Sequence, residues 1–529
     1  MKKIIVELLI AVSAITIFSS CGVTKEESGN IKENISSEEE QQSETKNENS
    51  DSSKAAGEST DVDNKVVNLE VAAETENINK KIGNAVLSGK YTQLELKTEG
   101  YDKIAQVLDS YSQDRKTEVE KNLSDCEDML GTEDSEDEYM SNIFYESTSN
   151  VMKADSNVVS ILENVYSYSG GAHPSTWYIS YTYDSNTGEE LKLGDIVNDK
   201  NVLPEIIEKE LKKKYPEETF LEPDSLKDDI TTIMDQEGQM SEYAEEGDEP
   251  QRGLTFTLGS NGLTFYFSNY EIAPYAAGVQ EVTLTFDEYP EIVKDEYKAH
   301  SENYIIKFDD AVKLENGEEL KVDVQTENDY DGKYTISVGD NKGQFEIYGF
   351  SNDKYLVHNE GKDFLYIQTV EENDWRHINI FSLDGTPSKV LESNLYFAYD
   401  YCPSDPANIR LSSHYDLLST YEGSRKYHIN AAGIPLADSD YDLIDSGIEL
   451  TLKKDLKAEV RKSADDAQGE TETVAAGTKL SFYATNGVYV DLVTEDGRYV
   501  RVTPSTESYP HTVNGENEED IFDGIVYAG

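Results

Sequence analysis

Cysteine is scarce in this sequence, and so are the patterns that would hold a metal. Three cysteines occur among 529 residues, Cys21, Cys126 and Cys402. A disulfide framework is therefore excluded, and Cys126 and Cys402 are expected to be buried or idle thiols. No paired Cys-x-x-Cys motif and no Cys/His set suggests zinc. We predict no metal site and no cofactor.

Basic residues are also few. Lysine and arginine total 46 against 106 aspartates and glutamates, which gives a net charge of −60. Such a chain repels nucleic acid and anionic lipid, so a nucleic-acid partner is not expected. A cationic protein such as lysozyme would be attracted. The same charge is also explained by a surface protein that only needs to stay soluble, so charge alone does not choose the ligand.

Long apolar runs are absent except at the start. Met1-Lys2-Lys3 precede an apolar run from Ile4 to Phe18, and Ser19-Ser20 stand directly before Cys21. This pattern is typical of a lipoprotein signal peptide over residues 1–21, with palmitate or a similar acyl chain on Cys21. The mature chain would then be extracellular, anchored by lipid to the outer face of the cytoplasmic membrane. An ordinary secretory signal or an uncleaved anchor is the alternative.

After Cys21, aromatic residues are missing until Tyr91. Residues 22–66 consist mainly of Ser, Glu, Asn, Gln and Lys, which cannot bury enough apolar area to offset the entropy of ordering. We predict a disordered acidic tether there, which would hold the folded part about 40 Å from the membrane.

The most patterned stretch runs from Ser167 to Val197. Gly170 and Gly171 predict a tight turn before Ala172-His173-Pro174. Trp177, Ile179, Tyr181 and Tyr183 then alternate as one face of a strand. After a β-turn at Asp184 to Gly188, Leu191 and Leu193 predict a second strand, and Asp195-Ile196-Val197 open towards a helix.

The flanking segments predict an α+β module over residues 67–300, an antiparallel sheet with packed helices. Residues 66–96 mix short alternations with helical material, and residues 101–145 predict a charged helix. Strands are expected at 158–168, 176–183, 254–258, 263–267 and 279–286, and helices at 202–211 and 221–234. Ser260-Asn261-Gly262 predicts a hairpin.

After residue 300 the pattern changes to short strands. Turn signals at Asn316-Gly317, Asp331-Gly332, Gly339-Asp340, Asp384-Gly385 and Ala432-Gly433 predict an all-β domain over 301–445. Residues 446–503 resemble a small bacterial SH3-like barrel, although the usual closing Gly-Trp-Val is replaced by Tyr499-Val500-Arg501-Val502. Residues 504–529 predict an acidic, partly ordered tail.

Two blocks of sequence carry a family resemblance. Gly170-Gly171-Ala172-His173, the aromatic strand and Leu191 to Ile196 form the first, and Leu263 to Gly278, with Tyr270 and Tyr275, forms the second. Together they resemble an extracytoplasmic domain of unknown function found in the lysozyme-sensing anti-sigma factor RsiV and in the peptidoglycan deacetylase PdaC. The resemblance covers residues 67–300 and implies an envelope-facing module without an agreed catalytic motif. Because only Met1-Lys2-Lys3 precede the apolar run, no cytoplasmic sigma-binding part is expected.

Several motifs could carry chemistry. His173 lies beside a Gly-rich turn, and a structural role in fixing that turn is favoured over catalysis. A deacetylase would need a metal site with His-x-x-x-His and an acidic pair near Thr-Phe-Asp-Asp-Gly. The sequence has no His-x-x-x-His, and Thr285-Phe286-Asp287-Glu288 is the nearest match to the acidic motif. Glu327 to Gly332 resembles half a calcium loop, but Val338 stands where a glutamate is required, so a plain acidic turn is expected.

We therefore predict a non-enzymatic, membrane-anchored surface lipoprotein that binds or senses a cell-envelope or extracellular ligand. The resemblance makes a lysozyme-like protein or peptidoglycan the leading ligand. Candidate ligand-binding residues are Gly170, Gly171, His173, Trp177, Tyr270 and Tyr275. A cell-wall-modifying enzyme with an unrecognised site around His173 is the alternative, and a passive spacer is a third reading.

Overall fold

The structure of the protein is a computed structural model. The structure describes residues 65–528 except 83–84, 131–141, 171–172, 239–252, 310, 327–330, 372–374, 399–400, 465 and 467. The predicted signal peptide, Cys21, nearly all of the predicted tether, Gly171 and most of the acidic turn at 327–330 lie outside the described residues. Within the described part, no helix has both the length and the apolar character needed to cross a membrane.

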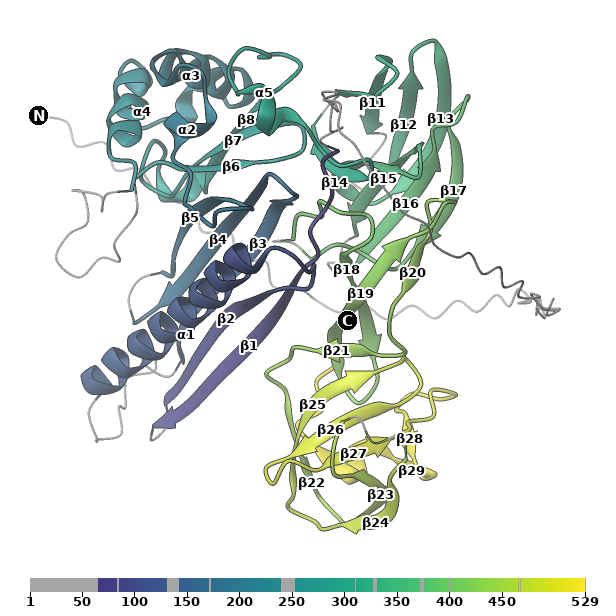
Figure 1. The fold of residues 1–529 in the computed structure, drawn as a ribbon. Coiled ribbons are helices and arrows are strands. Elements are labelled where there is room, and N and C mark those ends of the chain that lie inside the picture. The colour runs from purple at the N-terminus through teal and green to yellow at the C-terminus, as the bar shows by residue number, and fades with distance from the viewer. Residues whose placement is uncertain are drawn as a thin grey trace, which may run out of the picture. The chain divides into compact units, whose positions relative to one another are not determined.

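The first folded element is a five-stranded sheet that carries a long helix (Figure 1). Its strands lie in sequence order, β1 (Val71–Ile82), β2 (Ala85–Leu96), β3 (Asn142–Ala154), β4 (Val158–Tyr168) and β5 (Ser175–Asp184). The helical material expected in 66–96 is wrong, because β1 and β2 pair antiparallel over their whole length. The exposed Glu and Asn side chains along β1 conceal the period of two.

Helix α1 (Asp102–Leu130) connects β2 to β3. Because it crosses the sheet, β2 and β3 run parallel, which corrects the expected purely antiparallel sheet. Ile104 and Leu108 are fully buried on the sheet. The predicted helix extended to residue 145, but Asn142 already begins β3, where alternate residues are buried.

The β4–β5 hairpin confirms the central sequence pattern. Trp177, Ile179, Tyr181 and Tyr183 are all buried on the side of α1. The turn that follows is confirmed, since Gly188 N–H donates to the Asp184 carbonyl at 2.8 Å. The second strand expected at Leu191 and Leu193 is wrong. Only an isolated bridge forms there, between Tyr183 and Glu190, and the short helix α2 (Leu193–Ile196) begins at once.

A smaller sheet completes the α+β part. The three strands β6 (Thr255–Leu258), β7 (Gly262–Phe267) and β8 (Gln280–Thr285) are confirmed, as is the hairpin at Ser260-Asn261-Gly262. Helices α3 (Leu203–Lys214), α4 (Leu226–Asp235) and α5 (Asp295–Lys298) accompany them. Pro204 stands in the first turn of α3, where its missing N–H costs nothing. Buried side chains of α3, α4 and the three strands form one hydrophobic core.

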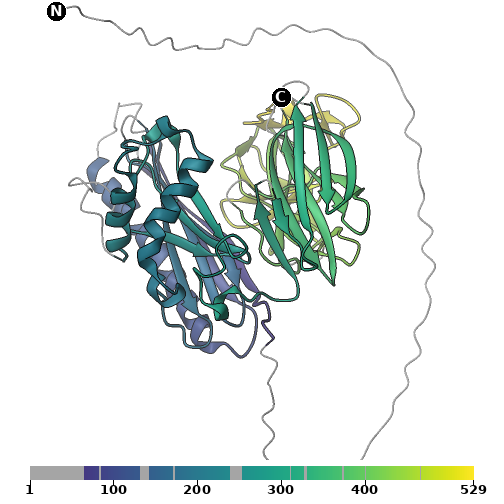
Figure 2. The ribbon, with the colours of Figure 1, turned by 90° about the horizontal axis from the view of Figure 1, so that it is seen from above.

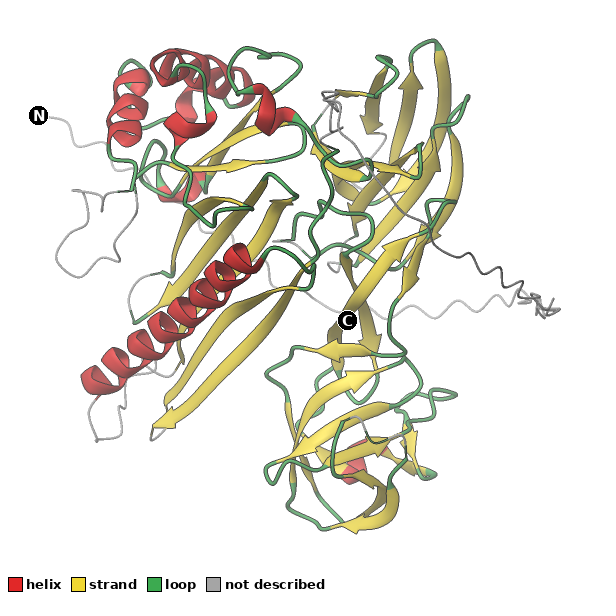
Figure 3. Cartoon of the chain, in the orientation of Figure 1, coloured by secondary structure: helices red, strands yellow, loops and turns green. Residues whose placement is uncertain are grey.

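The chain after residue 303 is rich in strands, as predicted, and the helices of the described part lie almost wholly before it (Figure 3). Strands β10 (Ala311–Lys313), β11 (Glu319–Thr326), β12 (Asp331–Val338) and β13 (Asn341–Tyr348) form one sheet. A second sheet has the order β17-β16-β15-β14-β9 and is drawn in green from above in Figure 2. Its strands are β9 (Tyr304–Phe308), β14 (Phe350–Asn359), β15 (Lys362–Val370), β16 (Arg376–Ser382) and β17 (Ser388–Ser393). The turn expected at Asp331-Gly332 is wrong, because Asp331 begins β12.

The last sheet follows the path β18-β19-β21-β25-β26-β27-β23-β24. Its strands are β18 (Ile409–Asp416), β19 (Thr420–Ile429), β20 (Pro435–Ala437), β21 (Asp442–Ile444), β22 (Glu449–Leu452), β23 (Leu456–Arg461), β24 (Glu470–Val474), β25 (Lys479–Thr485), β26 (Val490–Thr494), β27 (Tyr499–Val502) and β30 (Phe522–Asp523). Every strand expected between 448 and 502 is present. The sheet is an open path over the described residues, so the SH3-like barrel is not confirmed.

The tail is more ordered than predicted. Strands β28 (Thr512–Val513) and β29 (Glu516–Asn517) pair, and helix α6 (Glu518–Ile521) leads into β30, which pairs with β22. Val513, Ile521 and Phe522 are buried in the core of this last sheet. The acidic composition of residues 504–529 indicated a partly ordered tail, but these three apolar side chains pack the segment against the last sheet.

Candidate functional site

The candidate site begins at the tip of the β4–β5 hairpin. The last paired residues are Ser167 and Ser175, and Gly170 adopts a φ of 91°, a left-handed conformation that favours glycine. His173 is exposed at this tip. Its Nδ1 donates to the Pro174 carbonyl at 2.9 Å, so the ring is bonded to backbone.

The loop after β7 supplies the rest of the site. Ser268 N–H donates to the Glu271 carboxylate at 2.7 Å, and Tyr270 N–H donates to the Ala273 carbonyl at 3.0 Å. These bonds hold Tyr270 at a φ of 70°, which is uncommon for a residue other than glycine. The loop is joined to β5 because Tyr178 N–H donates to the Ser268 hydroxyl.

The structure brings three of the predicted residues together. The rings of His173 and Tyr275 stack with centroids 4.1 Å apart, and the rings of Tyr270 and Tyr275 lie 5.9 Å apart. The Tyr275 hydroxyl donates to the Pro174 carbonyl at 3.0 Å, so loop and hairpin are bonded directly. We call His173, Tyr270 and Tyr275 the hairpin-tip cluster. Tyr270 is exposed, with 59% of its surface accessible to solvent.

Trp177 does not belong to this cluster. It is only 4% exposed and lies on the α1 side of the sheet, where its ring packs at 6.3 Å from that of Tyr145. As a ligand-binding residue Trp177 was therefore a wrong choice. The alternation of β5 that made it conspicuous places its side chain in the core.

A half-buried acid, Glu271, lies in the same loop as Tyr270 and Tyr275. Burial raises the pKa of Glu271 to about 8, although the hydrogen bond from Ser268 N–H opposes this rise. The carboxyl is thus largely protonated in neutral water and leaves the loop without an extra charge. Glu271 follows the exposed Tyr270 directly, so it helps to fix the position of that ring.

The described residues hold no group of three or more histidine, cysteine, aspartate or glutamate side chains that could bind a metal ion. Neither Cys126 nor Cys402 forms a disulfide within the described residues. Burial raises the pKa of Cys402 to about 11, so its reactive thiolate form is suppressed.

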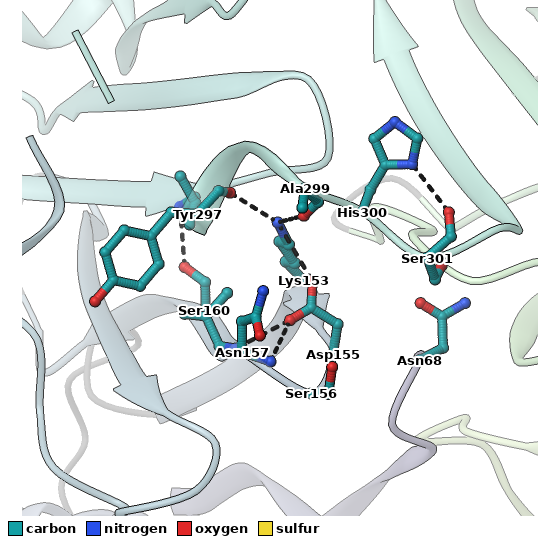
Figure 4. Close-up of polar contacts among 12 residues, drawn as sticks. Asn68, Lys153, Asp155, Ser156, Asn157, Ser160, Tyr297, Ala299, His300 and Ser301 are labelled. Atoms are coloured by element: carbon teal, nitrogen blue, oxygen red, sulfur yellow. Dashed lines mark hydrogen bonds and ion pairs between the residues drawn. The ribbon is translucent and has the colours of Figure 1, made fainter. Parts of the chain in front are cut away.

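A second polar network lies where β3 ends, and Figure 4 shows its side chains. Lys153 is 3% exposed and donates to the carbonyls of Tyr297 and Ala299, at 3.1 and 2.9 Å. Its ammonium lies 3.3 Å from the Asp155 carboxylate. Burial lowers the pKa of Lys153, and the charge of Asp155 opposes this. A cavity of about 10 Å³ beside it has room for one water at most, so this network is structural.

A groove that the sequence did not suggest lies between α1 and β5. It has a volume of about 550 Å³ and is lined by one stripe of α1 and by Tyr181 and Tyr183. The lining residues of α1 recur every three or four positions, but the helix and the strand are far apart in the chain. No local sequence motif could therefore have predicted that these residues line one groove.

Two family models match this chain. Residues 74–176 match the model described as Deacetylase PdaC, and residues 194–287 match the model described as a protein of unknown function (DUF3298). The predicted resemblance is thereby confirmed, and both models fall inside the α+β part. The two matches suggest an extracytoplasmic, cell-envelope-related domain. The hairpin tip lies at the end of the PdaC match, and Tyr270 and Tyr275 lie within the DUF3298 match.

Solved structures of the DUF3298 family are also similar. A member from Bacteroides fragilis is 19% identical, and the match covers 43% of this chain and 94% of that one, with a TM-score of 0.33. A member from Pseudomonas aeruginosa is 16% identical, with coverages of 44% and 97% and a TM-score of 0.29. No curated protein matches this chain.

Proposed function

We propose that this protein is a non-enzymatic recognition module of the cell envelope, held by lipid on Cys21 at the outer face of the cytoplasmic membrane. The signal-like start of the sequence and the two envelope-related family matches support this placement. The tether would allow the module to reach ligands in the wall layer and beyond it.

The hairpin-tip cluster carries the proposal. Rings from two distant segments are locked to each other and to backbone carbonyls, while Tyr270 remains open to solvent. Rigid tyrosines bury large contact area at low entropic cost, and they are enriched among the residues that dominate binding energy at protein interfaces. His173 is bonded to backbone instead of being aimed at a nucleophile, which suits recognition better than catalysis.

A basic protein of the lysozyme type is the partner that we favour. The chain carries a net charge of −60, and such a field accelerates encounter with a cationic protein. Aromatic side chains on a hairpin and a loop can then enter a cleft of that protein. Peptidoglycan is the other ligand that the envelope setting favours.

Retention of the full-length protein, kept in detergent, on immobilised lysozyme tests the proposal. The wild type should be retained at low salt and lost as ionic strength rises. Tyr270→Ala should weaken retention at least about tenfold. Tyr509→Ala is the matched control, because Tyr509 is also exposed, at 72%, but lies in the last part of the chain. Equal retention of Tyr270→Ala and the wild type would contradict the proposal.

A wall-modifying enzyme is the alternative that the same protein preparation can test. Incubation with purified peptidoglycan should leave its muropeptides unchanged. Muropeptide release by the wild type that disappears in His173→Ala would show catalysis at the hairpin tip and overturn the non-enzymatic proposal.

A further inference from the structure

The groove between α1 and β5 has the size of a small-molecule site. Its volume of about 550 Å³ falls within the range of roughly 300–1,000 Å³ that is common for ligand pockets. Gln106, Ser110 and Asp114 line it from α1, and Tyr181 and Tyr183 line it from β5. We call it the α1–β5 groove. None of its lining residues belongs to the hairpin-tip cluster.

Both ends of this groove are held in place. At one end, the turn after β5 approaches α1 so closely that a Cβ on Gly188 would lie 3.1 Å from Val107 Cγ2 and 3.2 Å from the Lys103 carbonyl oxygen. At the other end, Arg115 is bonded through Nη1 to both carboxylate oxygens of Glu163, each at 2.8 Å. The groove is therefore preformed, which reduces the entropic cost of binding.

The aromatic part of the lining is continuous. The rings of Tyr181 and Tyr183 are nearly parallel, with centroids 6.2 Å apart, and Tyr111 meets Tyr181 edge-on at 5.2 Å. These rings are largely buried, with 4% of Tyr111, 8% of Tyr181 and 9% of Tyr183 exposed, so each borders the groove through a small part of its surface. The guanidinium of Arg115 lies over the rings of Tyr111 and Tyr181, which stabilises their positions.

The polar part of the lining is available for a ligand. Within the described part of the chain, the side chains of Lys103, Gln106, Ser110 and Asp114 have no hydrogen-bond or ion-pair partner. Together they offer an ammonium, an amide, a hydroxyl and a carboxylate along one stripe of α1. Lys103 and Asp114 carry opposite charges, and Arg115 is already paired with Glu163 and Glu118. Glu190 also lines the groove and is paired with Lys192, so the groove has little net charge to attract an ion.

We propose that the α1–β5 groove is a second binding site, and that it takes a short uncharged saccharide. Sugar rings combine apolar C–H surface, which packs on aromatic side chains, with hydroxyl groups that need donors and acceptors at several points. A groove bordered by the small exposed parts of Tyr181 and Tyr183 and by unpaired polar side chains of α1 offers contacts of both kinds. A nucleotide or an anionic polymer would find Lys103 as the one unpaired cation of the lining described here, with the carboxylate of Asp114 on the same stripe of α1 opposing it.

The site goes beyond the proposed recognition of a protein, and its test is independent of that proposal. Gln106→Trp would fill the groove from an exposed position of α1. Gln113→Trp is its matched control, because Gln113 is the same residue type, is exposed on the same helix and does not line the groove. Neither change touches the hairpin-tip cluster, and both sites are exposed, so the fold should be kept.

Calorimetric titration of the full-length protein with tri-N-acetylglucosamine and with maltotriose decides the matter. The wild type should bind at least one of them, Gln106→Trp should weaken binding at least about tenfold, and Gln113→Trp should stay within about twofold of the wild type. Binding of the first sugar alone would assign selectivity for acetamido groups, and binding of both would assign a general saccharide site. No binding of either sugar, or equal binding by wild type and Gln106→Trp, would overturn the inference. Lysozyme retention measured on the same variants should not change.

Discussion

The imidazole of His173 lies against the phenol ring of Tyr275, with centroids 4.1 Å apart and planes inclined by 30°. One residue belongs to the β4–β5 hairpin and the other to the loop after β7. The Tyr275 hydroxyl also donates to the carbonyl of Pro174, next to His173. The loop thus fixes the hairpin tip, and the exposed ring of Tyr270 is presented by both segments together.

Removing that hydroxyl should loosen the tip while the fold is kept. Tyr275→Phe retains the stacked ring but loses a partly exposed hydrogen bond, which contributes about 0.5–1.5 kcal/mol. We expect weaker lysozyme retention with a nearly unchanged free energy of unfolding, measured by urea denaturation. A variant that binds as well as the wild type would show that the hydroxyl does not position the cluster.

The buried carboxyl of Glu271 predicts a pH dependence of stability. Its folded-state pKa is raised to about 8, well above its ordinary value of 4.5, so the folded protein holds a proton that the unfolded chain has released. The contribution is full below about pH 4.5 and is lost as pH rises through about 8, by about 1.4 kcal/mol for each pKa unit. Glu271→Gln should flatten this part of the curve of unfolding free energy against pH. An equal slope in both proteins would contradict the assignment.

The close packing of α1 on β2 predicts a steric requirement at Gly89. A Cβ there would lie 2.5 Å from Val119 Cγ1 and 2.8 Å from Leu123 Cδ1. Gly89→Ala should therefore lower the free energy of unfolding by about 1–3 kcal/mol, because the helix must shift. Gly447→Ala is the control, since nothing lies within 4 Å of its added Cβ. Thermal unfolding of both variants provides the comparison, and equal midpoints would contradict the packing described.

The ion pair between Arg115 and Glu163 predicts non-additive substitutions. Glu163 is fully buried, and burial raises its pKa while the charge of Arg115 opposes that rise. Arg115→Met would leave a buried carboxyl without its partner and should cost about 3–5 kcal/mol. Adding Glu163→Gln should recover a large part of this loss in urea denaturation. If the two single effects simply add, the pair is not coupled as the geometry indicates.

Local patterns predicted much of the fold. The alternation of Trp177, Ile179, Tyr181 and Tyr183 identified β5, and Ser260-Asn261-Gly262 identified the β6–β7 hairpin, because each signal depends on neighbouring residues. β1 was missed because its outer residues are charged and its partner β2 supplies the pairing. The path of the last sheet was also missed, since residues near 442 pair with residues near 485.

The candidate site was predicted in part for the same reason. His173, Tyr270 and Tyr275 were conspicuous beside glycines and in aromatic runs, although only the fold shows that they meet. The α1–β5 groove was missed altogether. Gln106 and Ser110 resemble any solvent-facing helix residues until β5 is placed opposite them. Trp177 was misjudged because the alternation along β5 shows which residues share a face of the sheet, but it does not show that α1 covers this face.

The central claim is that this protein recognises a basic partner through its hairpin tip without transforming it. The dissociation constant of the full-length protein for lysozyme, measured by calorimetry for wild type and Tyr270→Ala side by side, tests this most directly. The account predicts saturable binding by the wild type and at least about tenfold weaker binding by Tyr270→Ala. Absence of binding by the wild type, or the same dissociation constant for both proteins, would contradict it.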